Sequence, residues 1–289
     1  MAIIVDNDTK LVVSGLTGSE GRFHGLRNRA YGTNLVAGVT PGKGGQDVEG
    51  VPVFNTVSDA VGEAGANTSM VFVPARFAPD AIYEAVDAGI TTVICITEHI
   101  PAHEMLRVYT YVRTKGVTLI GPNCPGVLSP GKANVGIIPA EVFKPGSIGL
   151  VSRSGTLTYQ IGNELAQRGL GNSTIVGIGG DPVVGSSFID VLEKFEADEE
   201  TTTVVLVGEI GGDEEEKAAT WISDHMSKPV FSYIAGFSAP PGKTMGHAGA
   251  IISGSSGTAV AKKEALEAVG VKVGTTPTEV AELVIAAAG

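Results

Sequence analysis

One histidine, His247, lies in a segment of small residues, KTMGHAGAIISGSSGTA, that runs from position 243 to position 259. These neighbours are too small to bury an imidazole or to pair with its charge, and they leave room for a group bonded to the ring. A ring nitrogen is nucleophilic when a hydrogen bond holds the other nitrogen. From the loop alone, a histidine without a chemical role is the simpler interpretation. Two further features favour a covalent phosphoryl carrier.

The first feature is a pair of turns that suit an anion. Residues 152–158 (SRSGTLT) follow a predicted strand and open a helix, so that Ser154, Gly155 and Thr156 offer hydroxyl and backbone N–H donors. Residues 253–258 (SGSSGT) have the same character before another predicted helix. Each turn alone is most often a plain helix cap. Two such turns with a histidine beside the second predict a phosphoryl group held between helix N-termini.

The second feature is Glu209, which follows the predicted strand 203–207 within the sequence Gly-Glu-Ile-Gly-Gly. A carboxylate at this edge of a sheet can accept the imidazole N–H, fix the tautomer and leave the other nitrogen free to attack phosphorus. An ordinary solvated loop carboxylate is the alternative, and the flanking glycines make it less attractive. His247 and Glu209 are therefore the predicted catalytic residues.

The N-terminal half carries a different binding pattern. Residues 15–21 (GLTGSEG) form a GxxGxxG turn after a predicted strand, where glycines let the backbone approach a phosphate at the start of a helix. A nicotinamide dinucleotide favours GxGxxG and an acidic residue after the second strand. Here Lys43 stands in that place, within GVTPGKGG, and suits a phosphorylated ribose or a pyrophosphate. With Ile96, Thr97 and Glu98 at another strand end, the pattern favours coenzyme A over NAD.

Strand-like and helix-like segments alternate in both halves of the chain, and elements of this kind position the residues named above. The alternation predicts an α/β fold with parallel, doubly wound sheets. We expect a first domain over 1–122, a Gly- and Pro-rich loop that serves as linker over 123–146, and a second domain over 147–289. The expected strands are 11–14, 34–39, 69–73, 91–96, 117–120, 148–151, 174–178, 203–207 and 230–234. The expected helices are 78–88, 102–115, 157–168, 187–195, 214–226 and 258–269.

Composition narrows the class of protein. The chain has 289 residues and a formal net charge of −11, so we expect neither nucleic acid nor an anionic membrane as partner. Two cysteines do not make a disulfide framework. No apolar run is long enough to span a bilayer, and the first residues do not resemble a signal peptide. The expected location is the cytoplasm.

Several other polar residues are set aside. His99, His103 and Glu104 do not suit a metal site, because Pro101 interrupts a continuous helix between the histidines, and no metal ligands are predicted. Cys124 is expected in a structural or CoA-lining role. We expect His24 and His225 at the surface.

The motifs GHAGAIISGSSGTA, SRSGTLTYQ, GEIGG, GIGGDP, GPNCPG and VTPGKGG together resemble the α subunits of succinyl-CoA synthetase (succinate–CoA ligase), in order and spacing over essentially the whole chain. The resemblance implies a CoA-binding Rossmann-like domain followed by a flavodoxin-like domain. It makes His247 the phosphorylated histidine, Glu209 its partner and Tyr159 a substrate-side residue. It also implies CoA contacts at Thr17, Gly18, Ser19, Glu20, Lys43, Ile96, Thr97 and Glu98. Glu20 departs from the family, which commonly has glutamine there, and Arg22 is placed to offset the added charge.

The resemblance implies a reaction in three steps, reversible overall. A nucleoside triphosphate phosphorylates His247, succinate takes the phosphoryl group, and the CoA thiol displaces phosphate from succinyl phosphate. The nucleotide and its Mg²⁺ are expected on a β subunit, in an αβ or α2β2 assembly of the tricarboxylic acid cycle. This chain has no Walker-type GxxxxGK[ST] motif, in agreement with that expectation.

Alternatives remain open at this point. A malate–CoA ligase is the nearest competitor, because acyl choice depends on few residues. A non-catalytic CoA-sensing module and an NAD-dependent dehydrogenase represent other classes. The sequence leaves ADP or GDP open as the nucleotide.

Overall fold

The computed structural model describes residues 2–240, 242–252 and 257–288. Its contacts divide the chain into two units. The N-terminal unit consists of residues 4–140 with 183–185, and the C-terminal unit of residues 1–3, 141–182 and 186–289. Each unit has its own sheet and helices and is described by itself.

The sheet of the N-terminal unit has the strand order β3-β4-β2-β1-β5-β6-β7. All neighbouring strands are parallel except β3, which is antiparallel to β4. From β4 to β7 this is the 3-2-1-4-5-6 order of a Rossmann fold, with a switch point between β1 and β5. The strands are β1 (Lys10–Ser14), β2 (Asn34–Val39), β3 (Asp47–Val48), β4 (Val51–Phe54), β5 (Thr68–Val71), β6 (Thr92–Cys95) and β7 (Thr118–Ile120).

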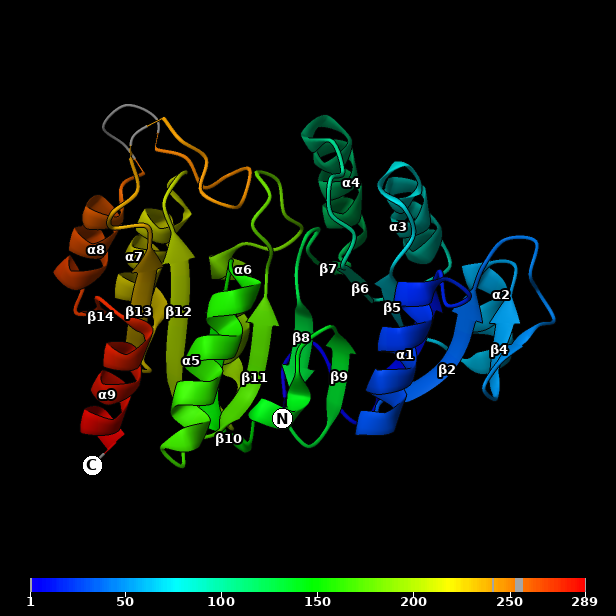
Figure 1. Cartoon of the computed structure of the whole chain (residues 1–289), viewed down its shortest axis with the longest axis horizontal. Helices are drawn as coiled ribbons and strands as arrows, with labels where there is room; N and C mark the ends of the chain where they lie inside the picture. Colours follow the sequence, from blue (N-terminus) through cyan, green and yellow to red (C-terminus); the bar gives the residue numbers. More distant parts are fainter. Residues whose placement is uncertain (1, 241, 253–256, 289) are drawn as a thin grey trace. The chain divides into compact units, whose positions relative to one another are not determined.

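Helices cover both faces of this sheet. Figure 1 shows α1 (Ser19–Tyr31) in front of it, whereas α2 (Val57–Ala64), α3 (Ala78–Asp87) and α4 (Ala102–Lys115) lie behind and pack against one another in that order. The central strands β5 and β6 are buried throughout, as expected for a parallel sheet with two covered faces, and they are apolar except for Thr68, Ser69 and Thr92.

The C-terminal unit contains a parallel sheet with the neighbour order β14-β13-β12-β10-β11. Counted along the unit, this is the 2-1-3-4-5 order of flavodoxin-like folds, with the switch point between β10 and β12. The strands are β10 (Pro145–Ser152), β11 (Asn172–Gly177), β12 (Thr203–Glu209), β13 (Val230–Ala235) and β14 (Lys272–Gly274).

Five helices accompany the described strands of this unit. Figure 1 shows α5 (Gly155–Gln167) and α9 (Pro277–Ala288) together on one face, with α6 (Phe188–Ala197) and α7 (Glu214–His225) on the other. The fifth, α8 (Ala259–Ala268), packs against α7. The α/β fold class, Rossmann-like and then flavodoxin-like, is confirmed.

The Gly- and Pro-rich segment 121–146 is not the loop that the sequence suggested. It contains an antiparallel hairpin of β8 (Gly126–Ser129) and β9 (Ala133–Gly136) and the first residues of β10. Glycine is required in the hairpin, because a Cβ at Gly126 would lie 2.3 Å from the Val135 carbonyl oxygen across the ladder. These glycines suggested a loop in the sequence, but in the structure they allow the two strands to pair closely.

Candidate active site

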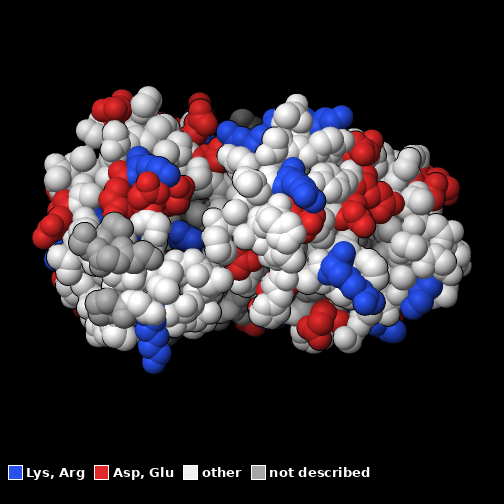
Figure 2. All heavy atoms as spheres, turned by 90° about the horizontal axis from the view of Figure 1, so that it is seen from above, with Lys and Arg blue, Asp and Glu red and all other residues white. Residues whose placement is uncertain are grey.

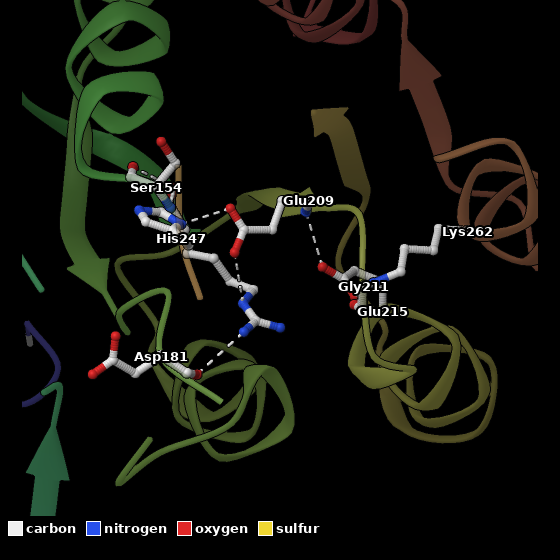
Figure 3. A network of polar contacts seen from close by, with 9 residues as sticks. Ser154, Asp181, Glu209, Gly211, Glu215, His247 and Lys262 are labelled. Carbon is white, nitrogen blue, oxygen red and sulfur yellow. Dashed lines mark hydrogen bonds and ion pairs between the residues drawn. The ribbon is translucent and has the colours of Figure 1, made fainter. Parts of the chain in front are cut away.

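His247 and Glu209 are in direct contact in the C-terminal unit. The ring Nδ1 lies 2.7 Å from Glu209 Oε2, and Figure 3 shows the two side chains pointing toward each other. Glu209 is the last residue of β12, beside the switch point, and its side chain is 6% exposed. His247 comes from the segment between β13 and α8, and its side chain is 25% exposed. A carboxylate can only accept here, so Nδ1 donates and Nε2 keeps the free lone pair.

The position of the imidazole depends on Gly180. A Cβ built at Gly180 would lie 2.2 Å from His247 Cγ and Nδ1, so the ring packs directly against the backbone of this residue. The sequence GIGGDP, which begins at the last residue of β11, therefore provides the space that the imidazole occupies.

A buried arginine completes the charged cluster. Arg153 follows β10, its Nε lies 3.4 Å from Glu209 Oε1, and its side chain is 8% exposed. The guanidinium also donates to the Asp181 carbonyl oxygen at 3.4 Å (Figure 3). The site thus consists of side chains at the ends of β10 and β12 and the His247 ring, which comes from the segment after β13.

The site raises the pKa of His247. The hydrogen bond to Glu209 is the main cause, because it favours the protonated ring, while burial of the ring and the charge of Arg153 oppose the rise. The neutral ring is the nucleophile, so its population grows as the pH rises through this elevated pKa.

The predicted phosphate turn at 152–158 begins helix α5. Ser154 caps the helix by accepting from the Leu157 N–H at 3.3 Å, and it belongs to the polar network drawn in Figure 3. Gly155 and Thr156 are the first helical residues. Their N–H groups have no carbonyl acceptor within the helix, because no helical turn precedes them. Tyr159 is half-buried in the next turn of α5.

The second predicted turn lies largely outside the described residues, which exclude 253–256. Its end is described: Thr258 caps α8 by accepting from the Ala261 N–H at 3.1 Å.

The GxxGxxG turn of the N-terminal unit joins β1 to α1. Gly15 adopts a positive φ of 93°, and a Cβ at Gly21 would lie 2.3 Å from the Gly15 carbonyl oxygen. Gly18 is the N-cap of α1 and has no side chain to occupy the first N–H groups of the helix. The backbone at Ser19 and Glu20 therefore presents donors at the positive end of α1.

The structure brings the predicted CoA-contacting residues to one edge of the sheet. Lys43 Nζ donates to the Thr17 hydroxyl at 3.2 Å, although the two residues follow different strands. Ile96, Thr97 and Glu98 directly follow β6, and the Thr97 hydroxyl donates to the Val73 carbonyl oxygen at 2.7 Å. These segments lie on both sides of the switch point between β1 and β5.

His24 is not the surface residue that we expected. Its ring stacks on Phe72 with centroids 5.6 Å apart and meets Phe23 edge-on at 4.9 Å. Burial lowers the pKa of His24, against the opposing effect of Glu20, whose Oε2 lies 3.8 Å from Nε2. Sequence alone did not indicate this contact, because Phe72 follows a different strand.

Cys124 and His225, which were not predicted to be catalytic, contact neighbouring groups of the protein. Among the described residues, no group of three or more His, Cys, Asp or Glu side chains is arranged to hold a metal ion. Cys124 is buried and its Sγ lies 3.3 Å from the Cys95 carbonyl oxygen. His225 is exposed, as expected, at the end of α7, where it stacks on Trp221 with centroids 5.0 Å apart.

No described helix is long and apolar enough to cross a lipid bilayer. On the face drawn in Figure 2, Lys and Arg side chains lie among Asp and Glu side chains.

Comparison with known families matches both halves of the chain. Residues 6–99 match the family described as CoA binding domain, and residues 151–272 match the family described as CoA-ligase. The fold and these matches define the class as a CoA ligase chain with a CoA-binding domain. The sequence is 62% identical over 284 residues to succinate–CoA ligase [ADP-forming] subunit alpha 2 of Archaeoglobus fulgidus, which covers 98% of this chain and 99% of that protein. It is 59% identical over 286 residues to the corresponding alpha subunit of Aquifex aeolicus, covering 98% and 94%. The chain belongs to the family of succinate–CoA ligase α subunits and is a ligase chain.

Solved structures share the fold. ATP citrate lyase from Methanothrix soehngenii, in complex with citrate and coenzyme A, matches with a TM-score of 0.86 and 23% identity over 99% of this chain and 52% of that chain. The dinucleotide-forming acetyl-coenzyme A synthetase 1 of Ca. Korarchaeum cryptofilum matches with a TM-score of 0.74 and 19% identity over 96% and 60%. This chain therefore spans about half to three fifths of the length of those chains.

The sequence indicated no role for Arg153 or Gly180, although they lie in the motifs SRSGTLTYQ and GIGGDP. Glu215 and Lys262, which are fully buried behind Glu209, were also missed. A signal for Lys262 was present. Lys262 lies on the apolar stripe of its helix, between Ala259 and Leu266, at helical spacing.

Proposed function

We propose that this chain is the α subunit of a ligase that interconverts succinate, CoA and a nucleoside triphosphate with succinyl-CoA, a nucleoside diphosphate and phosphate, through a phosphohistidine on His247. The observation that carries this proposal is the 2.7 Å contact between His247 Nδ1 and Glu209 Oε2, which leaves Nε2 as the nucleophile. The names of the relatives from Archaeoglobus fulgidus and Aquifex aeolicus support succinate as the acid and ADP as the nucleotide formed.

In the first step, Nε2 of the neutral ring attacks the γ-phosphorus, the N–P bond forms, and the bond to the bridging oxygen breaks to release the nucleoside diphosphate. The ring becomes positively charged as the bond forms, and the Glu209 carboxylate on Nδ1–H stabilises that charge. The free N–H groups at the start of α5, at Gly155 and Thr156, are the proposed donors to the phosphoryl oxygens.

In the second step, a succinate carboxylate oxygen attacks phosphorus and the N–P bond breaks, which gives succinyl phosphate and the neutral ring. The CoA sulfur then attacks the acyl carbon, the carbon–oxygen bond to phosphate breaks, and the thiol proton passes to solvent. The acyl phosphate replaces an unactivated carboxylate as the electrophile. We propose Tyr159 on the substrate side of α5.

The residues of the N-terminal unit fit an anionic CoA group. Three groups at one sheet edge offer hydrogen-bond donors. They are the tightly packed backbone of the 15–21 turn, the start of α1 at its glycine N-cap, and the Lys43 ammonium next to Thr17. Ser19, Glu20 and the 96–98 segment complete the proposed contacts. The mercaptoethylamine thiol of CoA would be the acyl acceptor when bound.

We place the nucleotide and its Mg²⁺ on a partner β subunit, in an αβ or α2β2 assembly located in the cytoplasm and acting in the tricarboxylic acid cycle. The α-subunit names of the relatives support a partner chain. The domain limits proposed are 1–122 for CoA binding and 147–289 for the ligase domain, joined by 123–146.

The test is phosphorylation with γ-labelled ATP or GTP and Mg²⁺, with and without a β subunit. The proposal expects a base-stable, acid-labile label that succinate plus CoA discharges and that is absent from His247→Asn. His225→Asn is the matched control, since that ring is exposed at the end of α7. A label that persists in His247→Asn would refute the phosphohistidine. Discharge by malate in preference to succinate would make the chain a malate–CoA ligase subunit.

A further inference from the structure

A buried ion pair lies directly behind Glu209 in the C-terminal unit. Lys262 on α8 and Glu215 on α7 are both 0% exposed, and Lys262 Nζ contacts Glu215 Oε2. Burial raises the pKa of the Glu215 carboxyl, and the ammonium of Lys262 opposes that rise. A charged pair is costly to remove from water, so its remaining polar contacts decide what it contributes.

Those remaining contacts go to the backbone that carries Glu209. Glu215 Oε1 accepts from the Glu209 N–H at 3.0 Å, and Lys262 Nζ donates to the Gly211 carbonyl oxygen at 2.6 Å. Figure 3 shows the two side chains on the opposite side of this backbone from His247. The pair thus holds one residue at each end of the turn 209–211.

Glycines allow this close approach. A Cβ at Gly208 would lie 2.6 Å from Glu215 Oε1, so the carboxylate packs directly on the backbone of β12. The Gly211 N–H also donates to the Gly257 carbonyl oxygen at 2.8 Å, which ties the same turn to the residues just before α8. The glycine at position 208 of the GEIGG sequence is therefore explained by the close approach of Glu215, whereas Gly211 also packs against the Gly249 carbonyl oxygen of the segment that carries His247.

We propose that Glu215 and Lys262 are positioning residues, which fix the backbone at 209–211 so that the Glu209 carboxylate reaches His247 Nδ1. The catalytic meaning of this inference rests on the proposed function, whereas the positioning itself does not. Neither side chain is proposed to contact a substrate.

A purely stabilising role makes a different prediction. Replacing a buried ion pair with apolar residues of similar size is often neutral or stabilising. If the pair only contributed to stability, the apolar replacement would leave the His247 contact intact. If it positions Glu209, the same replacement leaves the Glu209 N–H and the Gly211 carbonyl without partners and shifts the carboxylate.

The experiment compares two double variants of the full chain. In Glu215→Leu/Lys262→Met neither backbone contact can form. In Glu215→Gln/Lys262→Met the amide oxygen can still accept from the Glu209 N–H. The pKa of His247 is measured by NMR in the absence of nucleotide and partner, with its signal assigned by His247→Asn. Leu266→Ala, a fully buried truncation on α8, controls for lost stability.

We expect the Leu variant to lower the pKa of His247 by about one unit, a tenfold change in proton affinity, because Glu209 is the main cause of the raised value. The Gln variant keeps the contact to the Glu209 N–H and loses the contact to the Gly211 carbonyl, so its pKa should fall less than that of the Leu variant. Leu266→Ala should remain close to wild type. An unchanged pKa in the Leu variant, or an equal fall in the Gln variant, would overturn the proposal. If the Leu variant does not fold, Gly208→Ala, whose Cβ displaces the Glu215 carboxylate, takes its place with the same expected fall.

This readout needs no phosphoryl transfer, so it stands apart from the test of the proposed function. If His247 is never phosphorylated but its pKa follows the pair as described, the positioning role holds and the catalytic role fails. If phosphorylation occurs, the Leu variant should reduce its maximal rate and leave the KM for nucleotide unchanged.

Discussion

At the scale of single residues, the candidate site depends on one carboxylate and one imidazole with unequal exposure. Glu209 is almost fully buried, whereas a quarter of the His247 side chain faces solvent. A buried carboxylate has few competing water partners, so its hydrogen bond to Nδ1 is strong and directional. The exposed part of the ring remains accessible to a phosphoryl donor. The pair therefore combines fixed orientation with access.

Glu209→Gln removes the charge and keeps an acceptor for Nδ1–H. We expect the pKa of His247 to fall, because the hydrogen bond to the Glu209 carboxylate is the main cause of its raised value. Since phosphorylation needs the neutral ring, the rate in wild type should rise with pH through the elevated pKa, and this rise should begin at lower pH in the variant. The plateau should fall by about 100-fold, because the charge developing on the ring loses its counter-ion. Phosphorylation rates at several pH values check this. Glu214→Gln, which neutralises a neighbouring acid on α7, should match wild type.

Glu20→Gln should strengthen CoA binding. Glu20 is exposed in the first turn of α1, where its charge opposes that of the phosphates expected there. We expect a gain of roughly two- to fivefold in affinity at low salt, typical of an exposed charge, and a smaller gain at high salt. Calorimetric titration at two ionic strengths measures both. Unaltered affinity at low salt would place the phosphates away from this turn. Glu63→Gln, at an exposed position on α2, is the control.

At the scale of elements, the central strands were predictable from the sequence because they are continuous apolar runs. The structure has β2 at the predicted residues, and β12 extends the prediction by two residues to include Glu209. The hairpin of β8 and β9 and the short β3 and β4 were missed. These strands are only two to four residues long, and β4, β8 and β9 contain glycine or proline, so neither periodicity nor composition distinguishes them from loops.

The candidate site was predictable to the extent that it depends on motifs at strand ends. His247 and Glu209 were identified because each stands among small residues. Gly180 and Arg153 were not, because their importance comes from contacts between segments distant in the sequence. No local sequence pattern predicts that a glycine after β11 will pack against the histidine ring from the segment after β13.

Gly180→Ala tests this contact between elements. The added Cβ would lie 2.2 Å from the imidazole, so the ring must move away. A displacement of about 1 Å at a reacting atom costs about 100-fold in rate, and we expect at least that loss in phosphorylation of His247. Thermal unfolding should show a folded protein. Gly62→Ala, on α2 with open space around its Cβ, is the matched substitution and should retain full phosphorylation. Normal phosphorylation in Gly180→Ala would mean that the ring reacts from another position.

At the scale of the whole molecule, the chain places the two proposed sites in two separate units. The N-terminal unit contains the 15–21 turn and the residues proposed for CoA, and the C-terminal unit contains the histidine and its partners. Both sites occupy the switch point of a parallel sheet, where adjacent loops diverge and leave room for a ligand. The same topological rule thus applies twice in one chain.

This separation predicts that CoA binding and phosphorylation can be lost independently. Gly21→Ala introduces a Cβ 2.3 Å from the Gly15 carbonyl oxygen and should weaken CoA binding at least about tenfold by distorting the turn. In the presence of a β subunit, its His247 should still accept phosphoryl from nucleotide, and succinyl-CoA formation should fail. Calorimetry with CoA and labelling with γ-labelled nucleotide measure the two steps. Loss of labelling in this variant would contradict the independence.

The stacked pair of Trp221 and His225 on α7 gives the protein a built-in optical probe. The chain has one tryptophan, so indole emission originates from the C-terminal unit alone. Because α7 also carries Glu215, the emission follows the melting of the helix that supports the candidate site. Fluorescence and circular dichroism recorded on one sample therefore separate the unfolding of this half of the chain from that of the other.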